Sequence, residues 1–204
     1  MYAIEMLNIT KKFGDFYANK DITIQVKNNE IHALLGENGA GKSTLMSVLF
    51  GMYHQEAGVI KLDGKEVDIK DPKHANKLGI GMVHQHFKLI KNFTVAENII
   101  LGMEEVKGGK IDLESAANKI SELSRKYGLE VNPKALVGDI SVGMQQRVEI
   151  LKMLYRDANI LIFDEPTAVL TPAEIEEFLA ILKNLQSEGK TILLITHKLN
   201  EIMA

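Results

Sequence analysis

The chain has 204 residues and a formal net charge of −3; 46% of its residues are hydrophobic and 25% are charged. This balance is ordinary for a globular protein with one buried core, and it gives no electrostatic sign of nucleic acid as a partner. Cysteine is absent, which excludes disulfides and thiolate metal sites. The N-terminus lacks the pattern of a signal peptide, and no stretch approaches the roughly twenty apolar residues of a membrane span. We therefore expect a cytosolic protein that reaches a membrane only through a partner.

The N-terminal segment predicts two half-buried strands. Apolar and polar residues alternate over residues 3–9 and 22–26, which is the period of a strand with one covered face. Residues 10–17 between them predict a loop rich in aromatic residues. Phe13 in this loop is a candidate to stack on a flat base, because such stacking needs only a π-face. The two other aromatic residues of the loop are expected to cover the core: Phe16 and Tyr17.

A glycine-rich loop follows the third predicted strand. Residues 31–35 read as a short buried parallel strand and residues 45–50 as a helix, so the loop joins a strand to a helix. Its spacing of glycines before Lys42 and Ser43 is that of a phosphate-binding P-loop. Glycines let consecutive N–H groups point into one concavity, Lys42 would reach the β- and γ-phosphates, and the Ser43 hydroxyl would bind Mg²⁺. The ATP-binding loop predicted in this way comprises Gly36, Glu37, Asn38, Gly39, Ala40, Gly41, Lys42, Ser43 and Thr44.

The middle of the chain changes from strands to helices. Residues 59–67 predict a hairpin with an Asp-Gly turn, and residues 80–84 predict a further strand that ends at Gln85. Residues 86–158 read as helical, with Thr94 and a glutamate three residues later as a capping box. Apolar residues at helical spacing in this region are expected to be core: Leu113, Ala117, Ile120, Leu123, Tyr127, Val148, Leu151 and Leu154.

The last third predicts strand, helix and strand. Residues 159–163 form an apolar strand that ends in two acidic residues. Thr171 predicts the start of the helix, because it is a capping residue followed by proline and, at the third position, glutamate. Residues 191–196 predict a buried strand that ends at His197. The chain stops within what reads as a further helix, so we expect it to be a piece of a longer polypeptide.

Polar residues follow the predicted buried strands and should converge. Ligands of open α/β sheets bind at the carboxyl ends of the strands, which is where the P-loop, Gln85, the acidic pair and His197 are expected. Asp164 would hold Mg²⁺ through water, and Glu165 could orient and deprotonate an attacking water. His197 could donate to a γ-phosphate. The predicted catalytic residues are therefore Lys42, Glu165 and His197.

These motifs, in this order and over essentially the whole chain, resemble those of the ATP-binding cassette (ABC) ATPases. The segments at 140–147, 164–172 and 196–203 are most similar to ATPase subunits of bacterial importers for simple sugars and nucleosides. Those subunits carry two cassettes in one polypeptide, so the resemblance implies that this chain is the first cassette. It also implies a peripheral position on the cytoplasmic side of the cell membrane.

The resemblance implies an α/β fold: a P-loop NTPase core with a mostly parallel sheet. An N-terminal antiparallel β subdomain, about residues 1–30 and 58–70, and an inserted α-helical subdomain, about residues 88–158, are added to this core. All of these would form one ABC ATPase domain over residues 1–204.

The resemblance also implies cofactors, partners and site residues. ATP and Mg²⁺ would bind with Phe13 on the adenine, while Gln85 would touch Mg²⁺ and couple the site to an integral membrane permease that works with a solute-binding protein. Residues 86–93, just after Gln85, are the candidate contact with that permease. A signature segment would complete the ATP site of a second cassette, and its residues here are Ser141, Val142, Gly143, Met144 and Gln145.

Two departures from the family pattern keep the first of two alternatives open. The family's usual Leu-Ser-Gly-Gly-Gln is Ile-Ser-Val-Gly-Met at residues 140–144, and Thr171 stands where the family usually has aspartate. The first alternative is a cassette that binds ATP with little turnover and mainly holds a dimer. The second is a soluble, non-transport ABC ATPase, which would act on ribosomes or DNA.

Overall fold

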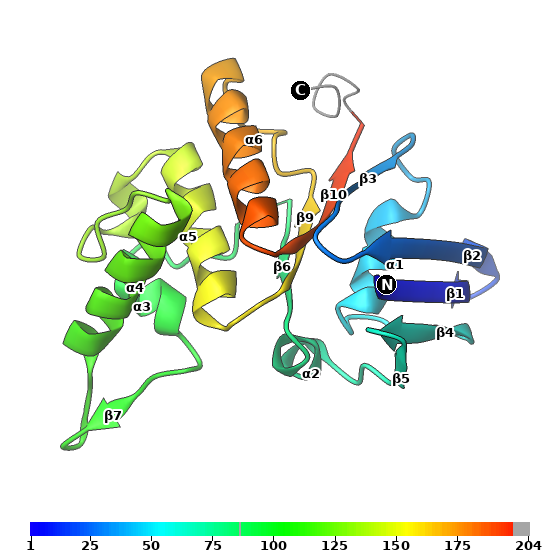
Figure 1. The fold of residues 1–204 in the computed structure, drawn as a ribbon, viewed down its shortest axis with the longest axis horizontal. Helices are drawn as coiled ribbons and strands as arrows, with labels where there is room; N and C mark the ends of the chain where they lie inside the picture. The colour runs from blue at the N-terminus through cyan, green and yellow to red at the C-terminus, as the bar shows by residue number, and fades with distance from the viewer. Residues whose placement is uncertain (86, 198–204) are drawn as a thin grey trace.

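A four-stranded parallel sheet lies at the centre of the fold in the computed structural model, which describes residues 1–85 and 87–197 (Figure 1). The order of its strands is β3-β10-β9-β6, and every pairing between them is parallel. The strands are β3 (Ile31–Leu35), β6 (Ile80–Val83), β9 (Ile160–Asp164) and β10 (Thr191–Thr196). Parallel sheets of this kind are buried on both faces, and here other elements of the chain cover each face.

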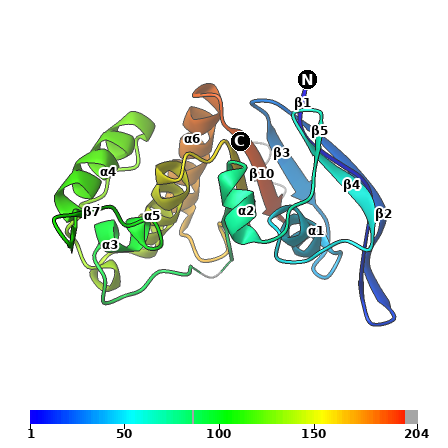
Figure 2. The same ribbon diagram turned by 90° about the horizontal axis from the view of Figure 1, so that it is seen from below.

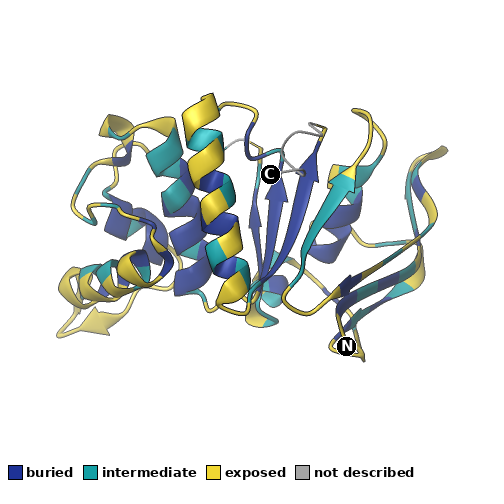
Figure 3. Ribbon diagram, turned by 45° about the horizontal axis from the view of Figure 1, so that its top comes forward, coloured by how far each residue is buried: buried dark blue, intermediate teal, exposed yellow. Residues whose placement is uncertain are grey.

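The two faces of this sheet belong to two separate hydrophobic cores. All residues of β9 and β10 are buried, and they appear dark blue in Figure 3. Because side chains of a strand alternate between faces, Leu161 and Phe163 pack with the helices, whereas Ile160 and Ile162 pack with the N-terminal part of the chain. The continuous apolar run of β9 is therefore the mark of a strand buried on both sides.

An antiparallel sheet covers one face, with helix α1 (Lys42–Leu49) between it and the parallel sheet (Figure 2). The order of its strands is β2-β1-β4-β5. Asp63 and Gly64 both have positive φ at the turn between β4 and β5, which confirms the predicted Asp-Gly hairpin. The strands are β1 (Tyr2–Phe13), β2 (Phe16–Lys27), β4 (Ala57–Leu62) and β5 (Lys65–Val67).

Helices cover the other face, with α5 and α6 nearest the sheet (Figures 1 and 2). Most of the apolar residues predicted to be core are buried or partly buried here, but Leu113 is 42% exposed. The capping box predicted at Thr94 is present, and so is the one at Thr171. The elements are α3 (Val95–Ile100), α4 (Leu113–Tyr127), a 3₁₀ turn (Val137–Asp139), α5 (Val142–Tyr155) and α6 (Pro172–Ser187).

Several expectations were wrong. The strand before the P-loop, β3, is at the edge of the sheet and only partly buried, because only β10 pairs with it. The aromatic stretch at 10–17 is not a loop: β1 and β2 continue through it to a tight turn, and Phe16 and Tyr17 are 65% and 44% exposed. A short helix and a hairpin were also missed: α2 (Pro72–Lys77), β7 (Val106–Lys107) and β8 (Lys110–Ile111).

Across residues 1–85 and 87–197, no helix has the length and apolar character that crossing a membrane requires. The further helix expected near the C-terminus falls outside the described residues.

Candidate functional site

The carboxyl ends of all four parallel strands carry the polar groups expected there. The P-loop follows β3, His197 follows β10, the acidic pair closes β9, and Gln85 follows β6. Because the four strands are parallel and adjacent, these groups share one edge of the sheet. One cavity of about 420 Å³ at this edge is lined by P-loop residues together with Gln85 and Glu165.

The P-loop is shaped by glycines and held by its own lysine. Gly39 and Gly41 have φ of 84° and 87°, in the left-handed region that favours glycine. A Cβ at Gly41 would collide with the carbonyl oxygen of Ala18, so the loop also lies against strand β2. The Lys42 ammonium donates to the carbonyl oxygens of Gly36 and Glu37 at 2.7 and 2.8 Å. The lysine is thus folded over the loop, with its charge at the N-terminus of α1.

Ser43, which lines the cavity, forms an oxygen-donor pair with Asp164. The Ser43 hydroxyl donates to Oδ1 of Asp164 at 2.8 Å. Burial raises the pKa of Asp164, and the neighbouring Glu165 charge acts in the same direction. No cluster of three or more carboxylate or histidine ligands occurs among residues 1–85 and 87–197. A hydroxyl and one carboxylate nevertheless fit Mg²⁺, which usually binds through one or two carboxylates, water and substrate phosphates.

Glu165 stands between Gln85 and His197. Its φ of 48° is unusual for a residue with a side chain, and its N–H donates to the Ile195 carbonyl at 3.0 Å. One carboxylate oxygen accepts from Nε2 of Gln85 at 3.3 Å, and the other lies 3.5 Å from Nδ1 of His197. Three strand ends therefore meet at one carboxylate, which is held in a sparsely populated backbone conformation of the kind often found at functional sites.

Two aromatic residues form one wall of the cavity. Phe13 is 44% exposed at the end of β1 and its cross-strand partner Phe16 is 65% exposed at the start of β2, so both strands of the hairpin tip offer a ring to the cavity. Tyr53 contacts the Phe13 ring edge-to-face, with 5.1 Å between the ring centroids. This contact fixes the Phe13 ring while leaving part of its surface open to a ligand.

The signature segment lies apart from this cavity. Ser141 caps α5 by accepting a hydrogen bond from the Met144 N–H, and the Gly143 N–H donates to Oε1 of Glu174 at 3.2 Å. A different cavity, of about 570 Å³, is lined by Ser141, Gly143, Met144 and Glu174 among others. The structure therefore brings together every predicted site residue except those of the signature.

Two residues that support the site were not among the predicted site residues. Asn19, on β2 and 5% exposed, donates from Nδ2 to the Gly41 carbonyl at 3.1 Å. Gln146, 2% exposed on α5, donates to the Pro166 carbonyl at 2.9 Å and so ties the signature helix to the segment after Glu165. Both act across the fold; Gln146 lies in the segment at 140–147 that carries the family resemblance, whereas Asn19 lies in none of the motifs.

Comparison with known proteins agrees with this geometry. A family model described as ABC transporter matches residues 19–168. The crystal structure of the ADP conformation of MJ1267, an ATP-binding cassette of an ABC transporter, superposes with a TM-score of 0.86 at 27% identity, covering 100% of this chain and 84% of that one. The predicted fold class, a P-loop α/β core with an antiparallel β subdomain, is confirmed.

Two curated relatives are similar over nearly the whole chain. The nucleoside import ATP-binding protein NupA of Lactococcus lactis subsp. cremoris (strain MG1363) is 62% identical over 98% of this chain and 40% of its own length. The guanosine import ATP-binding protein NupO of Bacillus subtilis (strain 168) is 64% identical over 94% of this chain and 38% of its own length. The chain thus spans about two fifths of the length of these relatives. By its matched motifs and fold, the chain belongs to the ABC transporter family.

Proposed function

We propose that this chain binds and hydrolyses ATP to power a permease that imports nucleosides or simple sugars. The observation that carries the proposal is the convergence of Lys42, the Ser43–Asp164 pair and the Glu165 carboxylate at one sheet edge. The names of NupA and NupO support the importer class, and nucleosides are the solute they favour. Residues 1–204 would act as one ABC ATPase domain, divided as the sequence predicts.

In this proposal, catalysis is positioning plus charge neutralisation. The P-loop N–H groups and Lys42 would hold the β- and γ-phosphates, and Phe13 would stack on the base. Bound Mg²⁺, held by Ser43, Asp164 and Gln85, would neutralise charge that develops on the phosphates. Glu165 would orient the attacking water and accept its proton, while His197 would contact the γ-phosphate.

The substitution Glu165→Gln tests the hydrolysis step. Glutamine keeps the size and the contact with Gln85 but cannot accept a proton, so we expect ATP binding to persist and turnover to fall about 100-fold or more. ATP affinity and steady-state phosphate release are measured on the full-length protein, with Glu66→Gln on the exposed strand β5 as the matched control. Undiminished turnover in Glu165→Gln would refute the role.

We further propose that ATP is closed in by a second cassette, whose site the segment at 141–145 completes. Residues of this segment line a different cavity from the P-loop of the same chain, which supports a role at the ATP site of another cassette. Val142 and Met144 replace a glycine and a glutamine of the usual motif. This replacement favours a second candidate function, in which the completed site turns ATP over slowly and mainly holds the two cassettes together. ATP turnover by the full-length protein separates the two candidates.

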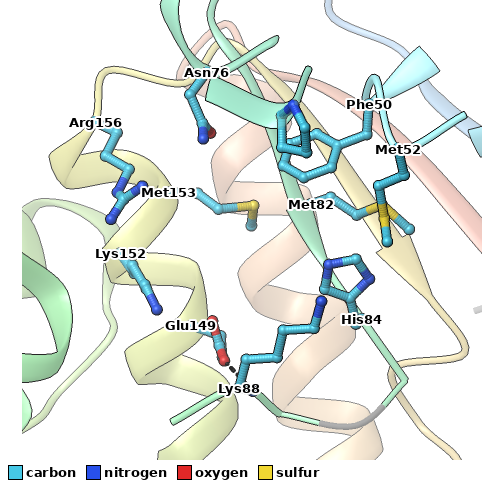
Figure 4. A pocket seen from close by; sticks show the side chains of 11 residues that line it. Phe50, Met52, Asn76, Met82, His84, Lys88, Glu149, Lys152, Met153 and Arg156 are labelled. Atoms are coloured by element: carbon cyan, nitrogen blue, oxygen red, sulfur yellow. Dashed lines mark hydrogen bonds between the residues drawn. The ribbon is translucent and has the colours of Figure 1, made fainter. Parts of the chain in front are cut away.

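A mixed groove between α2, β6 and α5 is the proposed contact with the permease, which would place the chain on the cytoplasmic side of the membrane (Figure 4). The contact was expected at 86–93, of which residue 86 lies outside the described residues. The described part mostly flanks the groove: Phe87 and Leu89 pack against the helical core. Methionines form the apolar part of the groove, and they adapt to irregular partners. Cations outnumber acids along its wall, so a short helix with an acidic side chain would fit. The residues that carry the argument are Met52, Met82, Met153, Lys88, Lys152 and Arg156.

Reversing charge in the groove tests this contact. The variant Lys88→Glu with Lys152→Glu should reduce co-purification of the permease from detergent-solubilised membranes, while ATP affinity stays unchanged. Lys65→Glu, on the exposed strand β5, is the matched control. A permease that copurifies equally with both variants would remove the groove from the proposal; ribosomes in its place would favour the soluble alternative.

A further inference from the structure

One carboxylate joins the N-termini of helices α5 and α6. Oε2 of Glu174 accepts hydrogen bonds from the Thr171 N–H at 2.9 Å and from the Thr171 hydroxyl at 2.8 Å, which is the capping box of α6. Oε1 of the same side chain accepts from the Gly143 N–H, at the start of α5, at 3.2 Å. The two oxygens of one carboxylate therefore hold two helix starts together, and Gly143 and Glu174 are 31 positions apart in the sequence.

The contact at α5 is close because residue 143 is glycine. A Cβ at this position would lie 2.6 Å from Oε1 of Glu174, so any side chain would push the carboxylate away. Hydrogen bonds from Thr171, with a smaller contribution from Gly143, hold the pKa of Glu174 below its ordinary value, so the group is anionic at neutral pH. A helix N-terminus favours such a negative charge. Glu174 thus fills, from within the chain, the kind of place that a phosphate would take.

In the proposed function, the Gly143 N–H would also be needed by a second anion. Gly143 belongs to the segment that would meet the γ-phosphate of ATP bound to the second cassette. A single N–H cannot serve a carboxylate and a phosphate at full strength, and two anions at one helix end repel each other. We infer that Glu174 is a displaceable latch: it occupies Gly143 until the phosphate of the opposing ATP takes its place.

The arrangement lets the latch open at little cost to the fold. Oε2 remains bound to Thr171 when Oε1 leaves Gly143, so α6 keeps its cap. Thr171 stands where the family usually has aspartate, and its hydroxyl gives Glu174 this second anchor. The cavity of about 570 Å³ beside these residues offers room for the carboxylate to move. The inference rests on the proposed function, since it concerns the same completed ATP site.

The test compares two glutamates in two capping boxes. Glu174→Gln removes the negative charge but keeps the cap, because glutamine also serves at this position of a capping box. Glu97→Gln makes the same change in the capping box of α3, where the glutamate accepts hydrogen bonds from Thr94 instead of from the signature segment. Both are made in full-length protein that also carries Glu165→Gln, and the ATP concentration for half-maximal closure of the two cassettes is measured by fluorescence transfer. Thermal unfolding checks that both variants fold.

We expect Glu174→Gln to lower that ATP concentration about three- to tenfold, and Glu97→Gln to leave it unchanged. If the parent responds to ATP but Glu174→Gln equals Glu97→Gln, or needs more ATP, the latch is overturned and the proposed function stands. If the parent shows no closure with ATP, the proposed function falls and the latch falls with it.

Discussion

The Ser43 hydroxyl donates to Oδ1 of Asp164 at 2.8 Å, joining the first turn of α1 to the last residue of β9 across 121 positions of sequence. The bond ties the helix that follows the P-loop to a strand that is buried on both faces. It also places a carboxylate, 9% exposed, where its ionised form is poorly hydrated. In the proposed function, this pair would bind Mg²⁺ at some cost to the stability of the metal-free fold.

Replacing this carboxylate by its amide should stabilise the metal-free protein. The pKa of Asp164 is raised in the folded state, so its favourable contribution is present below the ordinary value of 3.8 and is lost as the pH rises through the folded pKa. At pH 7 we expect Asp164→Asn to raise the free energy of unfolding by about 1 kcal/mol and Tm by about 2–4 °C. Thermal unfolding from pH 3 to pH 8 measures the difference, which should vanish at the acid end.

The same variant should lose stabilisation by Mg²⁺ with ATP, because in the proposed function these ligands bind the folded state through Asp164. If the metal-free Asp164→Asn protein is less stable than the parent at pH 7, burial does not dominate the pKa of Asp164.

Two neighbouring glycines should respond differently to alanine. Both have left-handed φ, which costs about 1–2 kcal/mol for a residue with a Cβ. Gly39 has no atom within 4 Å of an added Cβ, whereas Gly41 meets the Ala18 carbonyl and the Asn19 amide. We expect Gly41→Ala to abolish measurable ATP binding and Gly39→Ala to weaken it only modestly. Equal ATP affinities in isothermal titration would contradict the packing of the loop on β2.

Removing the Phe13 ring should weaken nucleotide binding without regard to the base. Stacking is worth about 1–3 kcal/mol, so Phe13→Ala should lower the affinity for ATP about 5- to 150-fold. Phe13→Trp should restore it, and GTP should follow the same pattern. Tyr53→Ala, which removes only the edge contact with Phe13, should have a smaller effect. Unchanged ATP affinity in Phe13→Ala would move the base to Phe16.

The buried amide of Asn98 should be needed for the segment after Gln85. Fully buried, it accepts from the Ile90 N–H at 2.7 Å and donates to the Ile90 and Thr94 carbonyls at 3.0 Å each. Asn98→Leu leaves these backbone groups without their hydrogen-bond partners. We therefore expect the free energy of unfolding to fall by about 3 kcal/mol and Tm to fall by about 6–12 °C. Asn118→Leu on the exposed side of α4 is the control, and equal Tm values would refute the role.

The features that the sequence predicted are local in the chain. Glycine spacing, an apolar run ending in Asp164 and Glu165, and a threonine three residues before a glutamate each act within one turn or one strand. The positions of Gln85 and His197 at strand ends also follow from short apolar runs. That these groups lie together then follows from the geometry of parallel sheets, and their distances agree.

The features that were missed depend on distant neighbours or on very short elements. The strands Val106–Lys107 and Lys110–Ile111 are too short to show a period, and only the Gly-Gly turn between them marks a hairpin. The aromatic stretch at 10–17 was misread because register shifts let β1 and β2 bend and continue. The contact of Glu174 with Gly143 joins two helices and leaves no pattern in either.

The division of the buried sheet residues between two cores has a consequence for how such a chain can diversify. Phe163 faces the helices and Ile162 faces the P-loop helix, although they are neighbours in the chain. The side chains of the two cores therefore pack independently of each other, although both cores include residues of the same sheet. Substitutions that repack the helices can therefore accumulate on one side of the sheet while the side that carries the P-loop keeps its geometry.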